Sequence, residues 1–246
     1  MNTIIKRHFS NDNIKKVILV RHGESIWNQE SKFTGWTNIP LTNNGKKEAK
    51  VIGQTLINNN IVPNILFSSV LIRSIETSNI IKDVLQENSK LDIPIYTSWR
   101  LNEKHYGTLE GIPRDYIRNL YGDKFTQLMR KSFSMKPPIV KEYNDDKIVK
   151  YPIYKNCYYN KIKNGESKEN VLDRFLPYFE NDILFTLSEN KLPLIITHKH
   201  TLRVLMKYLL KINDEDFEHY DVPNKSLIVL SFDNNNNYLT NSIMKY

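Results

Sequence analysis

An arginine and a histidine stand together at the end of an apolar segment, and their chemistry suits phosphoryl transfer. Residues 16–20 read Lys-Val-Ile-Leu-Val, which is typical of a buried strand, and Arg21-His22-Gly23 follow directly. Ligands of open α/β sheets bind beyond the carboxyl ends of strands, so His22 is expected to face a crevice. A neutral imidazole can attack phosphorus while the Arg21 guanidinium offsets charge on the phosphoryl oxygens.

A second histidine follows a second apolar segment. Residues 194–197 are expected to form a strand that ends at His198, and Arg73 stands at the start of a predicted helix. A single histidine after a strand is usually structural, and an isolated Arg-His-Gly tripeptide is usually a loop. If the two strands are neighbours in one sheet, both rings reach one crevice. Two histidines with Arg21 and Arg73 then favour phosphoryl transfer.

The segments that must position these side chains alternate between strands and helices. Strands are predicted at 16–20, 65–67, 95–96, 194–197 and 226–232. Helices are predicted after Thr42, at 73–85, at 114–129 with a break near Gly122, through Val171, Phe175, Phe179 and Ile183, and at 201–210, while 136–165 is an irregular insertion. The alternation predicts an α/β fold, a three-layer α/β/α sandwich with a mainly parallel sheet.

Longer strings around these residues resemble the cofactor-dependent phosphoglycerate mutase family of the histidine phosphatase superfamily. They are RHGESIWN at 21–28, FTGW at 33–36, SVLIRSIET at 69–77, WRLNEKHYG at 99–107, RKSF at 130–133 before two prolines, and IITH at 195–198. The resemblance covers about residues 16–240. Several motifs in the family's order are far more specific than any one of them.

The resemblance implies a role for each matched residue. His22 would carry a phosphoryl group, Glu103 would be the general acid and base, and His198 would steady the transition state. Phosphate would bind Arg21, Asn28 and Arg73, and substrate would bind Thr34, Gly35, Tyr106, Arg114, Arg130, Lys131 and Lys199. From residue type alone, Glu103 could equally be a solvated carboxylate, Asn28 a helix cap and Thr34-Gly35 a turn.

The family resemblance also implies an activity. It is the interconversion of 3-phosphoglycerate and 2-phosphoglycerate in glycolysis and gluconeogenesis, with 2,3-bisphosphoglycerate as the phosphoryl primer of His22 and no metal. Two alternatives stay open. One is a phosphatase that acts on bisphosphoglycerate or another small phosphoester. The other is a catalytically weak paralogue that binds phosphometabolites or protein partners.

Several positions depart from the family's pattern. Where the family reads HGNSLR, this chain has Lys199 and His200 in place of glycine and asparagine. Lys199 either crowds a bound anion or points away, and its charge could disfavour protonation of His198. Arg114 stands where lysine is usual, and Lys131 where arginine is usual. Each exchange changes how a phosphate is bound, because arginine offers a planar fork of donors and lysine a flexible point charge.

Two further departures lie near the end of the sequence. Lys225 stands where the family has glycine. The sequence also stops at Tyr246, before most of the family's C-terminal tail. A tail that covers a site excludes water, so its loss is expected to favour phosphatase chemistry.

Length, composition and charge agree with a small-molecule enzyme. The 246 residues suit a single catalytic domain at 14–246 after a disordered extension at 1–13. The net charge of +8 comes from scattered basic residues without a nucleic-acid-binding module, and no apolar run could span a bilayer. Cys157 is the only cysteine, which excludes an internal disulfide. We therefore expect a cytoplasmic protein that binds a small phosphorylated carboxylate and neither nucleic acid nor membrane; the resemblance implies a homodimer or homotetramer.

Overall fold

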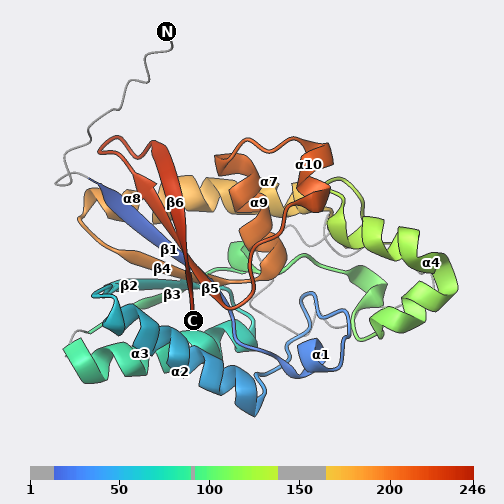
Figure 1. The fold of residues 1–246 in the computed structure, drawn as a ribbon, viewed down its shortest axis with the longest axis horizontal. Coiled ribbons are helices and arrows are strands. Elements are labelled where there is room, and N and C mark those ends of the chain that lie inside the picture. The colour runs from blue at the N-terminus through green and yellow to red at the C-terminus, as the bar shows by residue number, and fades with distance from the viewer. Residues whose placement is uncertain (1–13, 90–91, 138–164) are drawn as a thin grey trace, which may run out of the picture.

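A six-stranded sheet forms the centre of the molecule, and helices cover both of its faces (Figure 1). The computed structural model describes residues 14–89, 92–137 and 165–246. The strands are β1 (Lys15–Arg21), β2 (Ile65–Ser68), β3 (Ile95–Thr97), β4 (Pro193–Thr197), β5 (Ser226–Phe232) and β6 (Tyr238–Lys245). The helices are α1 (Ile26–Gln29), α2 (Asn43–Asn58), α3 (Ile72–Ser89), α4 (Arg114–Lys131), α7 (Lys168–Tyr178), α8 (Phe185–Ser188), α9 (Lys199–Leu209) and α10 (Asp214–His219). The predicted three-layer α/β/α sandwich is confirmed.

The order of strands brings two distant parts of the chain together. The sheet runs β3-β2-β4-β1-β5-β6, so β1 and β4 are neighbours although 171 residues lie between the end of β1 at Arg21 and the start of β4 at Pro193. The pairs β3-β2, β2-β4 and β4-β1 are parallel, whereas β1-β5 and β5-β6 are antiparallel. Of the six described strands, only β5 therefore runs against the others. The prediction of a mainly parallel sheet is confirmed.

Strand β1 has side chains buried on both faces, which explains its continuous apolar character. Val17 and Leu19 belong to the cluster formed with α7 and α9, and Ile18 and Val20 to the cluster formed with α2 and α3. All four are fully buried. Burial of each aliphatic side chain contributes roughly 1.5–3 kcal/mol, so β1 is firmly anchored between the two helical layers.

The predicted helix through Val171 and Ile183 is present, with one local change. Helix α7 is followed by the π-helical turn Phe179–Ile183, where the Leu184 amide donates to the Phe179 carbonyl at 2.8 Å. Apolar residues repeat here every four positions, more than the 3.6 of an α-helix. A wider turn offsets this drift, and Ile183 is fully buried like Val171.

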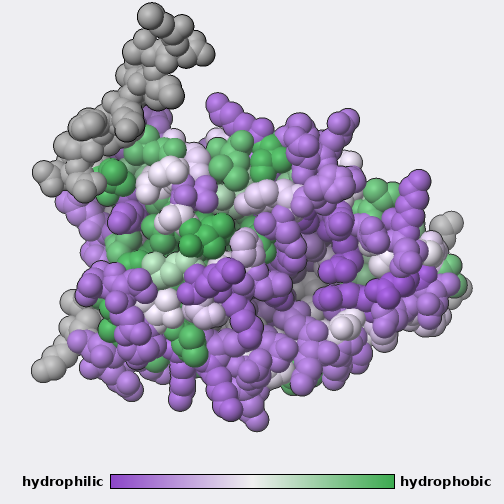
Figure 2. All heavy atoms as spheres, viewed as in Figure 1, coloured by the Kyte–Doolittle hydropathy of each residue, from purple (hydrophilic) through white to green (hydrophobic). Residues whose placement is uncertain are grey.

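One strand has no counterpart in the sequence prediction. Strand β6 pairs with β5 after a turn at 234–237, but none of its residues is buried and half of them are polar. Figure 2 shows hydrophobic residues gathered over this end of the sheet on an otherwise largely hydrophilic face. An edge strand lacks the apolar run of a central one. The predicted disordered extension at 1–13 and nearly all of the insertion at 136–165 lie outside the described residues.

No helix in the described ranges is both long enough and apolar enough to cross a bilayer.

Candidate active site

The two strand-terminal histidines lie against each other. Arg21 at the end of β1 is paired with Thr197 at the end of β4, and the His22 amide donates to the Thr197 carbonyl at 3.0 Å. The ring centroids of His22 and His198 are 4.8 Å apart, with the planes tilted by 58°. The neighbouring strands that the sequence argument required are therefore present.

His22 is held in one tautomer by the backbone. Its Nδ1 lies 2.6 Å from the Gly23 carbonyl, which can only accept a hydrogen bond, so Nδ1 carries the hydrogen. The Nε2 lone pair is then available as a nucleophile. Burial, followed by the charges of Arg73 and Arg21, lowers the pKa of His22 well below its usual value and keeps the ring neutral.

Gly23 allows a close approach at this point. A Cβ on Gly23 would collide with the backbone of Gly45 in the first turn of α2, and the Gly23 amide donates to Thr77 Oγ1 at 3.1 Å. The absence of a side chain thus lets α2 pack directly behind His22, which fixes the position of the ring.

His198 is fully buried and lies behind His22. Its Nε2 is 2.7 Å from Ser69 Oγ, at the end of β2. Burial lowers the pKa of His198, and the charges of Arg73 and of His22 lower it further. Lys199 points away, because its Nζ forms an ion pair with Asp221 at 2.7 Å. Of the two orientations considered for Lys199, the structure shows this one, although the residue still lines the cavity rim.

Cations and backbone groups surround the His22 end of the cavity. Arg21 Nη2 donates to Asn28 Oδ1 at 3.3 Å. Arg73, in the first turn of α3, donates to the carbonyls of Gly35 at 2.7 Å and Thr37 at 3.0 Å. Gly35 has a φ of 51°, a conformation that glycine adopts without strain. The Thr34-Gly35 turn is thus fixed against Arg73 beside the two histidines.

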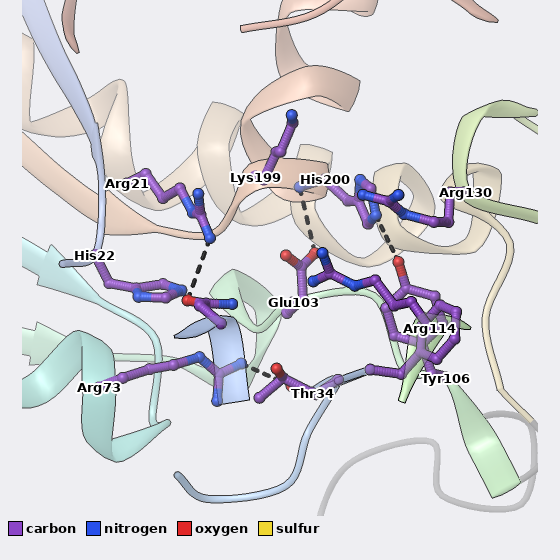
Figure 3. Close-up of a pocket in the computed structure, with 13 residues that line it drawn as sticks. Arg21, His22, Thr34, Arg73, Glu103, Tyr106, Arg114, Arg130, Lys199 and His200 are labelled. Atoms are coloured by element: carbon purple, nitrogen blue, oxygen red, sulfur yellow. Dashed lines mark hydrogen bonds between the residues drawn. The ribbon is translucent and has the colours of Figure 1, made fainter. Parts of the chain in front are cut away.

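Glu103 stands in the middle of the cavity (Figure 3). Its Oε1 accepts from the Lys104 amide at 2.8 Å and from the His200 amide at 3.3 Å. Burial raises the pKa of Glu103, and these hydrogen bonds and the charge of Arg73 only partly oppose the rise. A buried carboxyl group with a raised pKa can donate as well as accept a proton near neutral pH.

A buried ion pair that the sequence analysis missed supports the Glu103 loop. Arg174 Nε lies 2.7 Å from Glu166 Oε1, and Arg174 also donates to the carbonyls of Arg100, Asn102 and Glu103 at 2.6–2.9 Å. Glu166 Oε2 accepts from the His105 amide at 2.8 Å. Both charged residues lie in a segment with no recognised motif, so only their burial identifies them.

A kinked helix brings two arginines to the far end of the cavity. Arg114 is the first residue of α4 and Arg130 is close to its end. A straight helix would separate them by roughly 24 Å, at 1.5 Å per residue. The predicted break is confirmed at Gly122, whose φ of 82° is not helical, and α4 folds into two arms (Figure 1). Both arginines consequently line the same cavity, beside Tyr106.

Most of the predicted site residues line one cavity; His198 contacts the His22 ring without lining it, and Lys131 lies elsewhere. The cavity is lined by Arg21, His22, Asn28, Phe33, Thr34, Gly35, Arg73, Glu103, Tyr106, Arg114, Arg130, Lys199 and His200. Lys131 lies instead on an adjoining cavity, which shares Arg130, Lys199 and His200 with the first. Phe33 and His200 line the cavity without having been predicted as site residues. The altered loop after His198 was the available signal for His200.

The cavity is chemically suited to a polyanion. Among the described residues that line it, four are arginines and Glu103 is the one carboxylate. Three buried polar atoms of its lining residues, Arg21 Nε, Thr34 Oγ1 and His200 Nδ1, have no hydrogen-bond partner within the described residues. Such atoms are rare unless a ligand or water satisfies them. Among the described residues there is no cluster of three or more potential metal ligands.

Burial of neutral histidines makes the stability of the fold depend on pH. Burial lowers the pKa of His22, His198 and His200 well below 6.5. Below pH 6.5 the unfolded chain binds protons at these positions and the folded chain does not. The free energy of unfolding therefore decreases as the pH is lowered. We expect the free energy of unfolding, measured with urea, to fall by about 1 kcal/mol per histidine between pH 6.5 and 5.5.

A matched pair of variants tests that assignment. His200→Gln should lose roughly a third of the histidine-dependent fall, whereas a substitution at the exposed His219 should not alter it. Lys168, whose pKa burial lowers to about 6, changes stability in the same direction and is common to all variants. An identical pH dependence for His200→Gln and the unmodified protein would show that folding does not lower the pKa of His200.

The fold and the site agree with comparisons of the whole chain. The sequence model of the histidine phosphatase superfamily, branch 1, matches residues 17–147 and 150–242. The chain therefore belongs to this superfamily. Solved structures agree on the fold: mycobacterial glucosyl-3-phosphoglycerate phosphatase superposes with a TM-score of 0.67 at 18% identity, over 95% of this chain and 98% of that one. Bacillus stearothermophilus YhfR has a TM-score of 0.67 at 23% identity, over 92% and 95%.

Sequence relatives are more specific. A protein of Buchnera aphidicola subsp. Cinara cedri, named 2,3-bisphosphoglycerate-dependent phosphoglycerate mutase, is 41% identical over 94% of this chain and 97% of its own length. Proteins with the same name from Corynebacterium efficiens and Haemophilus influenzae are 36% and 34% identical, over 85% and 91% of this chain and 81% and 97% of their own lengths. Within the superfamily, the chain belongs with the phosphoglycerate mutases named for their dependence on 2,3-bisphosphoglycerate.

Proposed function

We propose that this protein interconverts 3-phosphoglycerate and 2-phosphoglycerate through a phosphohistidine at His22, in glycolysis and gluconeogenesis. The observation that carries the proposal is the neutral His22 ring, with Nδ1 bonded to the Gly23 carbonyl and Nε2 available beside His198. The shared name of relatives at 34–41% identity supports the choice of substrate. A covalent relay divides one difficult transfer into two easier steps.

Each group in the cavity has a place in this reaction. Arg21, Arg73 and Asn28 bind the phosphoryl group at His22, and His198 donates a hydrogen bond to its oxygens as charge develops. Arg114, Arg130 and Tyr106 bind the substrate's carboxylate or second phosphate at the other end. Glu103 gives a proton to the departing hydroxyl oxygen and takes one from the attacking hydroxyl.

The same groups fit the primer that the relatives' name implies. 2,3-Bisphosphoglycerate, when bound, supplies the phosphoryl group that His22 holds between turnovers. Its two phosphates would lie at the Arg21–Arg73 end and the Arg114–Arg130 end, with Thr34, Gly35 and Lys199 at the sides. Lys131 reaches the second anion only from the adjoining cavity. The proposed mechanism uses no metal.

A phosphorus NMR time course tests the activity. Purified protein with 3-phosphoglycerate and a catalytic amount of 2,3-bisphosphoglycerate is expected to produce a 2-phosphoglycerate signal, with a lag or no product when the primer is omitted. Release of inorganic phosphate in step with substrate loss would identify a phosphatase instead. Binding of 3-phosphoglycerate by calorimetry without turnover would identify a paralogue that only binds phosphometabolites.

The remaining predictions concern the organisation and setting of the protein. We propose a single catalytic domain at 14–246, a cytoplasmic location, and assembly as a homodimer or homotetramer. The small phosphorylated carboxylate is its proposed partner, and neither nucleic acid nor a membrane is expected to bind. Light scattering after size exclusion would measure the mass of the assembly directly.

A further inference from the structure

His200 makes a contact that the proposed reaction has not used. Its Nε2 lies 2.7 Å from the Tyr106 hydroxyl, and its Nδ1 is buried with no partner within the described residues. Both side chains are more than nine-tenths buried, and both line the cavity that contains His22 (Figure 3). The Tyr106 ring is fixed by packing against Phe33, with centroids 4.9 Å apart.

The hydrogen bond between these residues can form in two ways. Either Tyr106 donates its hydroxyl hydrogen and His200 carries its own hydrogen on Nδ1, or His200 donates from Nε2 and the tyrosine hydrogen is free to point elsewhere. No described group bonds to Nδ1, so none favours one tautomer over the other through that nitrogen. Which of the two residues donates the hydrogen bond is therefore determined by the group that contacts the Tyr106 hydroxyl.

Both arrangements require a neutral His200 ring and a Tyr106 phenol that keeps its hydrogen, and the surroundings of the pair favour both states. Burial lowers the pKa of His200, and the positive charges of neighbouring lysine and arginine side chains lower it further, so the ring has one hydrogen. Burial and the nearby Glu103 carboxylate raise the pKa of Tyr106, so the phenol keeps its hydrogen.

An anion at the far end of the cavity would settle the direction. Arg114 and Arg130 line that end with Tyr106, and an anionic oxygen beside the phenol needs a donor rather than a lone pair. The phenol can donate there only if it stops donating to His200. His200 must then place its single hydrogen on Nε2 to avoid two facing lone pairs.

We propose that the substrate's carboxylate switches the tautomer of His200, which becomes a donor to Tyr106 and turns the tyrosine hydroxyl hydrogen toward the ligand. The inference rests on the proposed function for the identity of that ligand. Tyr106 passes its hydroxyl hydrogen to Nε2 and takes one from solvent, which accepts the hydrogen that leaves Nδ1, so the pair has the same net charge before and after. His200 is then a positioning residue that acts through Tyr106.

Nitrogen NMR of protein labelled in its histidines observes the switch directly. The His200 signals are assigned by their loss in His200→Gln, and unphosphorylated protein is titrated with 3-phosphoglycerate or with glycerol 3-phosphate, which lacks the carboxylate. In the free protein the Nε2 signal should lie between the shifts of an unprotonated and a protonated nitrogen, and 3-phosphoglycerate should move it to the protonated value. Glycerol 3-phosphate should leave it unchanged.

Substitutions at His200 give an independent measurement. Gln places an amide N–H at the position of Nε2 and should keep KM for 3-phosphoglycerate within a few-fold, while Leu should raise it about tenfold with kcat little changed. Tyr106→Phe should match His200→Leu, and the double variant should be no worse than either. Equal KM values for His200→Leu and His200→Gln would overturn the proposal.

The outcomes separate this inference from the proposed function. A tautomer switch on 3-phosphoglycerate binding without mutase turnover would overturn the activity and leave the switch standing. Turnover with an unchanged Nε2 signal in the bound state would overturn the tautomer switch and support the mutase activity. Absence of any 3-phosphoglycerate binding by calorimetry would overturn both.

Discussion

Asparagine in place of His22 will abolish the phosphoenzyme and lower turnover by at least about 10⁴-fold, the scale seen when a covalent nucleophile is removed. The amide nitrogen of asparagine occupies the position of Nδ1, so the bond to the Gly23 carbonyl at 2.6 Å can be kept. Nothing then stands where Nε2 was. The loss should therefore be in chemistry, with thermal stability close to that of the unmodified protein.

The measurement is labelling with ³²P-2,3-bisphosphoglycerate, followed by mass spectrometry of the phosphopeptide. His198→Asn is the matched control, because the two rings are 4.8 Å apart and both are buried. It should form the phosphoenzyme slowly and still label the peptide that contains His22. A label on the His198 peptide in His22→Asn would instead make His198 the acceptor.

The architecture of the site could be predicted where local pattern and fold rules agree. Buried strands have continuous apolar runs, and two such runs ending in histidine implied a shared crevice once the strands were neighbours. Gly122 also predicted the kink in α4. Glycine destabilises the interior of a helix, so its presence there favours a position where the backbone leaves the helical conformation. These features depend on a few adjacent residues.

Other features depend on contacts across more than 70 positions, and a single sequence gives no sign of them. Arg174 and the carbonyls of the Glu103 loop are one example, because an arginine in a helix usually faces solvent. The Tyr106–His200 contact is another, joining residues 94 positions apart. Strand β6 was not predicted for a different reason: an exposed edge strand does not need a run of apolar residues.

The substitution Glu103→Gln should lower mutase turnover by about 10²- to 10⁴-fold, the usual contribution of a general acid or base. Glutamine has the same shape, and its Oε1 can still accept from the amides of Lys104 and His200. What it lacks is a proton to give. Because burial raises the pKa of Glu103, its acid form is more accessible in the natural protein than that of a solvated carboxyl group, and KM should change little.

Two phosphoryl donors with different leaving groups distinguish a loss of proton transfer from a change in the structure of the cavity. When 2,3-bisphosphoglycerate phosphorylates His22, the departing alkoxide needs a proton, so Glu103→Gln should slow the step by the full factor. p-Nitrophenyl phosphate releases a stable phenolate that needs none, so phosphorylation of His22 from this ester should be nearly unaffected. Stopped-flow bursts with the two donors measure both rates. An equal loss with both donors would show that Glu103 shapes the cavity and does not act as the acid.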